Sequence, residues 1–163
     1  MAAGNTYVAL ATNTLSSAAA SVTFSSISGA YTDLVLVVVG GNVSGGGNCR
    51  IEINGDTGSN YSSTRILGTG SAASSAREAS ATSIQTGDVT GTDRLANIVN
   101  LMNYANTTTY KTVLSRSNSN SYVSAYVGLW RSTAAIASII YSVGGGGSFV
   151  SGTTFTLYGI AAA

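Results

Sequence analysis

The side chains that could perform chemistry in this chain are few. It has six acidic residues, one lysine, one cysteine and no histidine. Without histidine, the usual relay from a nucleophile to a general base cannot be built, although serine is abundant. A serine–lysine pair would have to use Lys111, and no S-x-x-K spacing occurs around it. We therefore expect a protein that is not an enzyme.

A glycoside hydrolase would need two facing carboxylates, one of them with a raised pKa. Asp88 and Asp93 are the acids nearest to each other in a suitable segment, and both lie in Gly87–Asp93. Because this segment is rich in glycine and threonine, it predicts a solvated turn. A carbohydrate hydrolase stays only a remote alternative, and no catalytic residue is assigned.

A metal site is equally poorly supported. Asn54, Asp56, Gly58 and Asn60 place side-chain oxygens at alternate positions, as a calcium loop does, but the distal acid of such a loop is absent. The segment predicts instead a hairpin turn held by Asn and Asp side chains. One cysteine without histidine cannot fill a zinc site, and Cys49 is interpreted as a small buried residue. We predict no metal and no cofactor.

The composition indicates how the chain meets its surroundings. Of its 163 residues 44% are hydrophobic and only 8% are charged, with a formal net charge of +1. A net charge this close to zero does not provide the strongly positive surface that binds nucleic acid or an anionic membrane. The longest apolar run, Leu34–Val39, is too short to cross a bilayer, and no signal peptide is evident. We expect a single domain over 1–163, made in a cytoplasm, with a short N-terminal arm possible in 1–20.

The elements that position these residues are predicted to be strands. The strongest pattern is Asp33–Val39, where Leu34, Leu36 and Val38 alternate with three valines, so both faces of the strand are expected to be covered. Leu95–Met102 and Phe149–Ile160 are further clear strands, whereas Gly68–Glu78 is predicted as a long loop. About eight to ten short strands and no helix beyond a turn or two indicate an all-β sandwich. A two-sheet jelly roll is favoured over an immunoglobulin-like sandwich, whose cysteine pair is missing.

The strand Tyr122–Trp130 has two contrasting faces. One face is aliphatic, with Val123, Ala125, Val127 and Leu129, and is interpreted as the core face. The other face is aromatic and has three interpretations: it flanks the second sheet, it stacks on sugar rings, or it forms a subunit interface, which we favour. The suspected interface residues are Tyr122, Tyr126, Trp130, Val35, Val37 and Val39.

Five strings in the expected order resemble a widespread group of small virion proteins of tailed phages. The first two are S-V-T-F-S-S-I-S with Y-T-D-L-V-L-V (Ser21–Val37) and N-G-D-T-G-S-N-Y-S (Asn54–Ser62). The others are N-Y…Y-K (Asn103–Lys111), G-L-W-R-S-T-A-A-I-A-S-I (Gly128–Ile139) and F-V-S-G-T-T-F-T-L-Y-G-I (Phe149–Ile160). Together they span nearly the full length of the chain. The chain departs from the group at Gly29–Ala30, where a proline-bearing turn is expected, and in a shorter loop at Gly40–Asn48.

The resemblance implies a β-sandwich structural protein of the virion without enzymatic activity. The expected role is that of a capsid decoration (cement) protein, a homo-oligomer and in particular a homotrimer, bound to the major capsid protein. A tail fibre or spike domain, bound to tail proteins or to a host surface glycan, is the alternative. The departures concern loops that contact partners, so they bear on the partner rather than on the fold.

Overall fold

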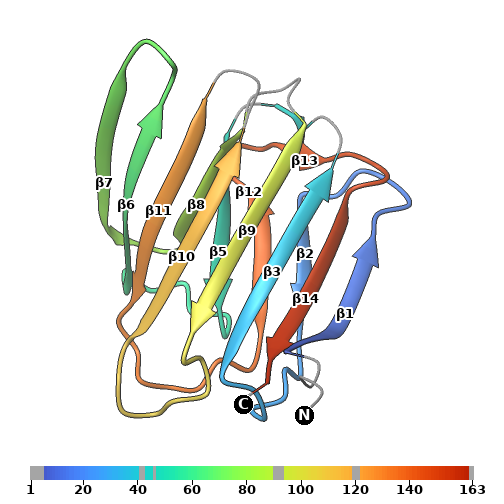
Figure 1. Cartoon of the computed structure of the whole chain (residues 1–163), viewed down its shortest axis with the longest axis vertical. Helices are drawn as coiled ribbons and strands as arrows, with labels where there is room; N and C mark the ends of the chain where they lie inside the picture. The colour runs from blue at the N-terminus through green and yellow to red at the C-terminus, as the bar shows by residue number, and fades with distance from the viewer. Residues whose placement is uncertain (1–5, 41–42, 46, 90–93, 119–121, 162–163) are drawn as a thin grey trace.

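The fold is an all-β sandwich with two main layers (Figure 1). The computed structural model describes residues 6–40, 43–45, 47–89, 94–118 and 122–161, and in these residues every regular element is a strand. The predicted β-sandwich is confirmed, whereas the jelly-roll connectivity is not confirmed. No helix of the described residues has the length and hydrophobicity needed to span a membrane.

The large sheet has eight strands in the order β1-β14-β3-β9-β10-β11-β6-β7. Each strand in it pairs antiparallel with its neighbours. In that order the strands are β1 (Tyr7–Thr14), β14 (Thr154–Ile160), β3 (Asp33–Gly40), β9 (Leu95–Met102), β10 (Lys111–Asn118), β11 (Val123–Trp130), β6 (Tyr61–Gly68) and β7 (Ala73–Ala81).

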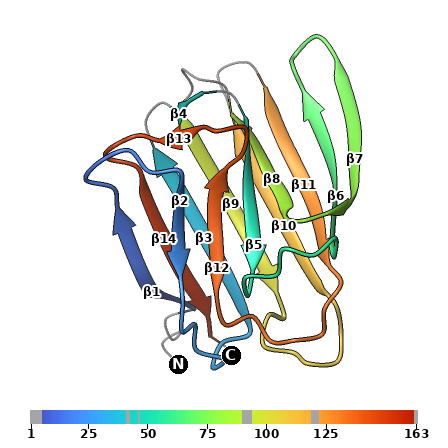
Figure 2. The same ribbon diagram turned by 180° about the vertical axis from the view of Figure 1, so that it is seen from behind.

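The small sheet has four strands and covers only the middle of the large one (Figure 2). Its order is β2 (Ser21–Phe24), β12 (Ile139–Val143), β5 (Gly47–Ile53) and β8 (Ile84–Val89). A short ribbon of β4 (Val43–Ser44) and β13 (Ser148–Phe149) lies at one end. Because the small sheet is half as wide, β6 and β7 extend past it on one side.

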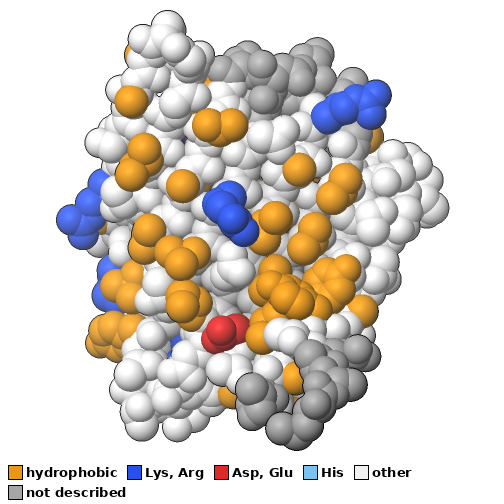
Figure 3. Space-filling view, viewed as in Figure 1, with side chains coloured by type: hydrophobic (Ala, Val, Ile, Leu, Met, Phe, Trp, Pro, Cys, Tyr) orange, Lys and Arg blue, Asp and Glu red, His pale blue; other side chains and the backbone are white. Residues whose placement is uncertain are grey.

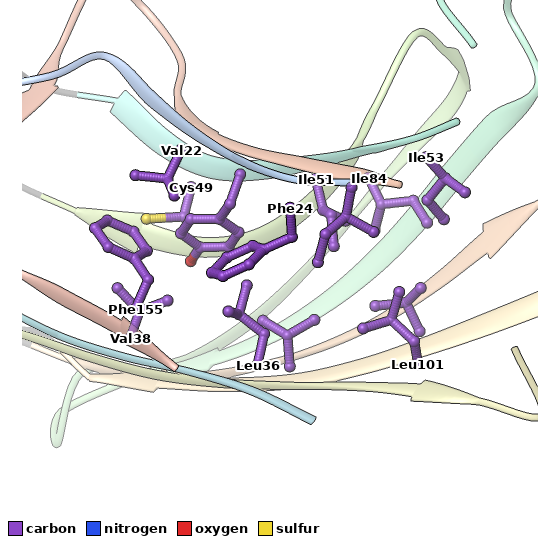
Figure 4. Packing of buried hydrophobic residues seen from close by; sticks show 14 of the residues in the cluster. Val22, Phe24, Leu36, Val38, Cys49, Ile51, Ile53, Ile84, Leu101 and Phe155 are labelled. Atoms are coloured by element: carbon purple, nitrogen blue, oxygen red, sulfur yellow. The ribbon is translucent and has the colours of Figure 1, made fainter. Parts of the chain in front are cut away.

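The core lies between the two sheets. Figure 4 shows Cys49 and Ile51 of β5 pointing toward Leu36 and Val38 of β3, and each of these side chains is fully buried. Aromatic rings fill the end of the core beside them, where Phe149 and Phe155 meet edge to face at 4.9 Å between ring centroids. The core therefore takes one face of each sheet and leaves the other face of each sheet outside.

Several predicted strands are confirmed closely, and others are corrected. β9 has the predicted bounds, and β3 runs one residue longer than predicted. The predicted number of strands was too low, since the described residues alone form fourteen. The loop predicted over Gly68–Glu78 is wrong, because β7 occupies most of it; its small polar residues are exposed on both faces and show no alternation.

The segment 1–20, in which a short N-terminal arm was considered possible, contributes a strand to the large sheet. Residues 7–14 form β1, which pairs with the last strand, β14, from Tyr7 opposite Ile160 to Thr14 opposite Thr154. The first and last strands of the chain are therefore neighbours in one sheet, and residues 1–5 lie outside the described part.

Candidate functional site: the open face of the large sheet

The two faces of β11 are the reverse of those predicted. Tyr126 and Trp130 point into the sandwich and are each 2% exposed, whereas Val123 is 65% exposed and Val127 is 54% exposed. The prediction that Tyr126 and Trp130 form an exposed interface is therefore wrong for the single chain. Tyr122 lies just before β11 and is partly exposed.

Trp130 faces inward because its polar atom finds a partner there. Its indole Nε1 donates to the Asp56 carboxylate at 2.7 Å, and its ring stacks on Tyr61 at 6.3 Å between centroids. Asp56 also accepts from the backbone N–H of Gly58 and from the Asn60 amide, and these bonds lower its pKa, the Trp130 bond most. The prediction that Asn and Asp side chains hold this turn is confirmed, but the predicted hairpin is wrong, because the turn joins β5 of the small sheet to β6 of the large sheet. A buried Trp130 also removes the basis for sugar stacking on this residue.

Tyr126 is held by a buried polar group at the β6 side of the sandwich. Its hydroxyl donates to the Asp88 carboxylate, which also pairs with Arg65 at 2.8 Å. Burial and the nearby Asp88 raise the pKa of Tyr126. Asp88 lies in β8 and is 6% exposed, so the predicted solvated turn is wrong at this residue. Its supposed partner Asp93 lies outside the described residues.

A cavity of about 300 Å³ opens beside this polar group, beneath the part of β6 and β7 that the small sheet leaves uncovered. Arg50, Arg65 and Glu78 line it, and Arg50 donates to both carboxylate oxygens of Glu78 at 3.1 and 3.2 Å. Each of these two arginines is thus paired with a carboxylate. The pairs hold the β6–β7 hairpin against β5 and β8.

The outer face of the large sheet is the main uncovered surface. Hydrophobic side chains are spread across it, with few charged side chains among them (Figure 3). Large hydrophobic residues on this face stay at least a third exposed on six different strands. They are Tyr7, Val39, Ile66, Met102, Leu114, Val123 and Val127.

Two shallow grooves run over this face. One, of about 670 Å³, lies over β6, β9, β10 and β11 and includes Ile66, Ile98 and Val123. The other, of about 520 Å³, reaches across to Tyr7 and Ile160 and includes Met102 and Leu114. Arg116 and Ala125 border both grooves, so the two form one continuous apolar surface.

The predicted valines of β3 belong to this surface. Val35, Val37 and Val39 alternate with the core residues of β3 and point to the outer face. Val39 is 54% exposed, Val37 is half-buried, and Val35 is 6% exposed within the second groove. No second layer of the described residues of the same chain therefore covers β3 at Val39, and cover there by a neighbouring subunit stays a prediction. These valines share the outer face of the large sheet with Val123 and Val127. Tyr126 and Trp130, which were predicted to lie with them, point into the sandwich instead.

The remaining reactive side chains are buried or dispersed. Cys49 is fully buried, and burial raises the pKa of its thiol to about 12. The Lys111 amine is buried and donates to the carbonyls of Thr109 and Thr133 at 2.9 and 3.2 Å, and burial lowers its pKa. In the part of the chain that the structure describes, no three Cys, Asp or Glu residues gather as metal ligands would.

Comparison with known proteins gives no family for this chain. No protein-family model matches the sequence, and no curated protein sequence matches it. What the residues can do is therefore argued from their geometry. Among the described surfaces, the open apolar face of the large sheet exposes the most large hydrophobic side chains, and such side chains favour burial against another surface.

Proposed function

We propose that this chain is a structural protein of a bacteriophage virion, an oligomeric capsid decoration protein that has no enzymatic activity. The single observation that carries the proposal is the open apolar face of the large sheet. A sheet in a monomeric sandwich ordinarily alternates hydrophobic residues inward with polar residues outward. Here aliphatic residues occur on both faces of β3, β9 and β10.

The size of this face supports an assembly role. Eight strands about 4.8 Å apart and eight residues long make a sheet about 34 Å wide and 26 Å long. The whole face, its polar residues included, is therefore about 900 Å², which is large enough to contain the roughly 800 Å² that one partner buries in a standard protein interface. Large exposed apolar patches of this kind mark interaction sites more often than chance surface.

The ordered strings that resemble tailed-phage virion proteins support the same role. Two of them lie largely in strands, Ser21–Val37 in β2 and β3 and Phe149–Ile160 in β13 and β14, and the other three lie mostly in connections between strands. The low charge supports it too, because a surface with few charges offers little repulsion against a second copy. A homotrimer on the capsid, in which this face holds the three copies together, agrees with all of these observations.

The first test is the state of assembly. The double variant Val123→Lys with Val127→Lys adds two charges to the open face, and we expect it to be monomeric by light scattering where the wild type is a trimer. The matched control is Ser21→Lys with Thr23→Lys, which adds the same charge to exposed positions of β2. A wild type that stays monomeric at 100 µM (roughly the upper range for weak interfaces) and does not associate with particles would refute the proposal.

The second test is the position of the chain in the particle. Gold-labelled antibodies against the chain are expected to mark the heads of purified virions. Labelling confined to tails would replace the decoration role by the fibre or spike role. Absence from virions would leave the chain outside this class of protein.

A further inference from the structure

We propose that copies of this chain join edge to edge, with β7 of one copy pairing antiparallel with β1 of the next. This deepens the assembly proposed above and depends on it. The occupant of each edge is therefore a second copy of the same chain.

Both edges of the large sheet are unpaired in the single chain. Among the described residues, β1 pairs only with β14 and β7 pairs only with β6. An edge strand presents a row of free backbone N–H and C=O groups, which is a template for another strand. In Figure 1 these two strands lie at opposite sides of the sheet.

The strand directions permit this pairing without turning a copy over. Seven successive antiparallel pairings link β1 to β7, so the two edge strands run in opposite directions. When a second copy is placed beside the first in the same orientation, its β1 runs antiparallel to β7. The alternation then continues from copy to copy, and a head-to-tail contact of this kind gives a ring when the rotation between copies closes and an open filament when it does not.

The lengths and the register of the edges also agree. β1 has eight residues and β7 has nine. One row of directly opposed residues crosses the whole sheet from Ser75 through Ile66 to Thr12. Ser75 and Thr12 therefore lie at the same height on the same outer face.

Part of the usual protection against edge pairing is missing here. Natural proteins block edges with lysine, proline, inward-pointing charge or β-bulges, and a register irregularity occurs in each edge pairing, at Ala9–Ala11 of β1 and opposite Tyr61–Ser63 of β6. The chain has no proline, and β1 (YVALATNT) has no charged residue. β7 carries Arg77 and Glu78, and Glu78 is engaged by Arg50 of β5. That ion pair fixes β7 against the body of the protein, which lowers the entropy lost on pairing.

Pairing at both edges satisfies the free backbone groups of β1 and β7. Each contact uses a different surface of each copy, as a head-to-tail interface requires.

Cysteine cross-linking tests the pairing. The double variant Thr12→Cys with Ser75→Cys places one thiol on each edge, in the same row of residues. Two further double variants cover a shifted register: Ala9→Cys in place of Thr12→Cys, and Ala73→Cys in place of Ser75→Cys. All four positions are exposed, while the native Cys49 is buried. Under mild oxidation we expect at least one double variant to give a ladder of covalent multimers that ends at the ring size.

The controls separate this inference from the assembly itself. A single-cysteine variant cannot extend beyond a dimer, and Thr23→Cys with Ser75→Cys, which moves one thiol to the small sheet, should give no ladder. Far-UV circular dichroism confirms the fold of each variant. An oligomeric protein in which no edge pair cross-links overturns edge pairing and leaves the assembly standing. A wild type that is monomeric overturns both.

Discussion

The hydrogen bond from Trp130 to Asp56 gives the sharpest test of the inward orientation of β11. The variant Trp130→Phe keeps an aromatic ring to stack on Tyr61 but deletes the indole N–H that lies 2.7 Å from the carboxylate. A hydrogen bond to a charged group contributes about 1.5–3 kcal/mol to stability. For a chain of this length, a loss of 2 kcal/mol lowers the Tm by about 4–8 °C.

The pH dependence of this loss identifies its cause. In the folded chain the pKa of Asp56 is lower than its ordinary value of 3.8, with the Trp130 bond as the largest cause. A lowered carboxyl pKa stabilises the fold above the ordinary value, and that contribution is lost as the pH falls through the folded pKa. The difference between wild type and Trp130→Phe should therefore be large at pH 7 and shrink below pH 3.8.

Urea unfolding followed by far-UV circular dichroism measures this difference at fixed protein concentration, because assembly would otherwise shift the apparent stability. The matched control is Tyr110→Phe, which removes a polar group from an aromatic side chain that is 55% exposed. It should change stability by less than about 0.5 kcal/mol. A loss for Trp130→Phe as small as the control, or one that does not vary with pH, would refute the reasoning.

Two further predictions concern the core. Gly128→Ala should cost about 1–3 kcal/mol by overpacking, because an added Cβ would lie 2.2 Å from Ile84 Cγ2. Gly68→Ala, with no atom within 4 Å of its Cβ, is the control in the same urea assay, and equal stability of both variants would contradict the packing. The Cys49 thiol, buried and with a pKa raised to about 12, should resist alkylation by iodoacetamide at pH 8 until urea unfolds the chain. Rapid labelling of the native protein, detected by mass spectrometry, would show that the thiol is accessible.

The strands with strong apolar alternation could be predicted from the sequence. β3 and β9 carry enough branched aliphatic residues to indicate strands without knowledge of their neighbours. β7 could not be found in this way, because its Ala and Ser residues are exposed on both faces and leave no periodic signal. It is a strand because β6 offers it a paired edge, which is a tertiary contact.

The candidate surface shows the same division. The alternation along β11 defines two faces, but it does not say which of them is inside. Tyr126 and Trp130 take the inner side because Asp88 and Asp56, each distant in sequence, accept their polar hydrogens there. The aliphatic face, which hydrophobicity alone assigns to the core, is left outside.

The sequence by itself determined the all-β class, the strand periodicity and the scarcity of reactive side chains, because these depend on residue type and local spacing. Only the tertiary structure decided which face of each strand is buried, that β1 and β14 are neighbours, and that the large sheet extends beyond the small one. These features depend on contacts between residues far apart in the chain, and such contacts leave no local pattern from which to predict them.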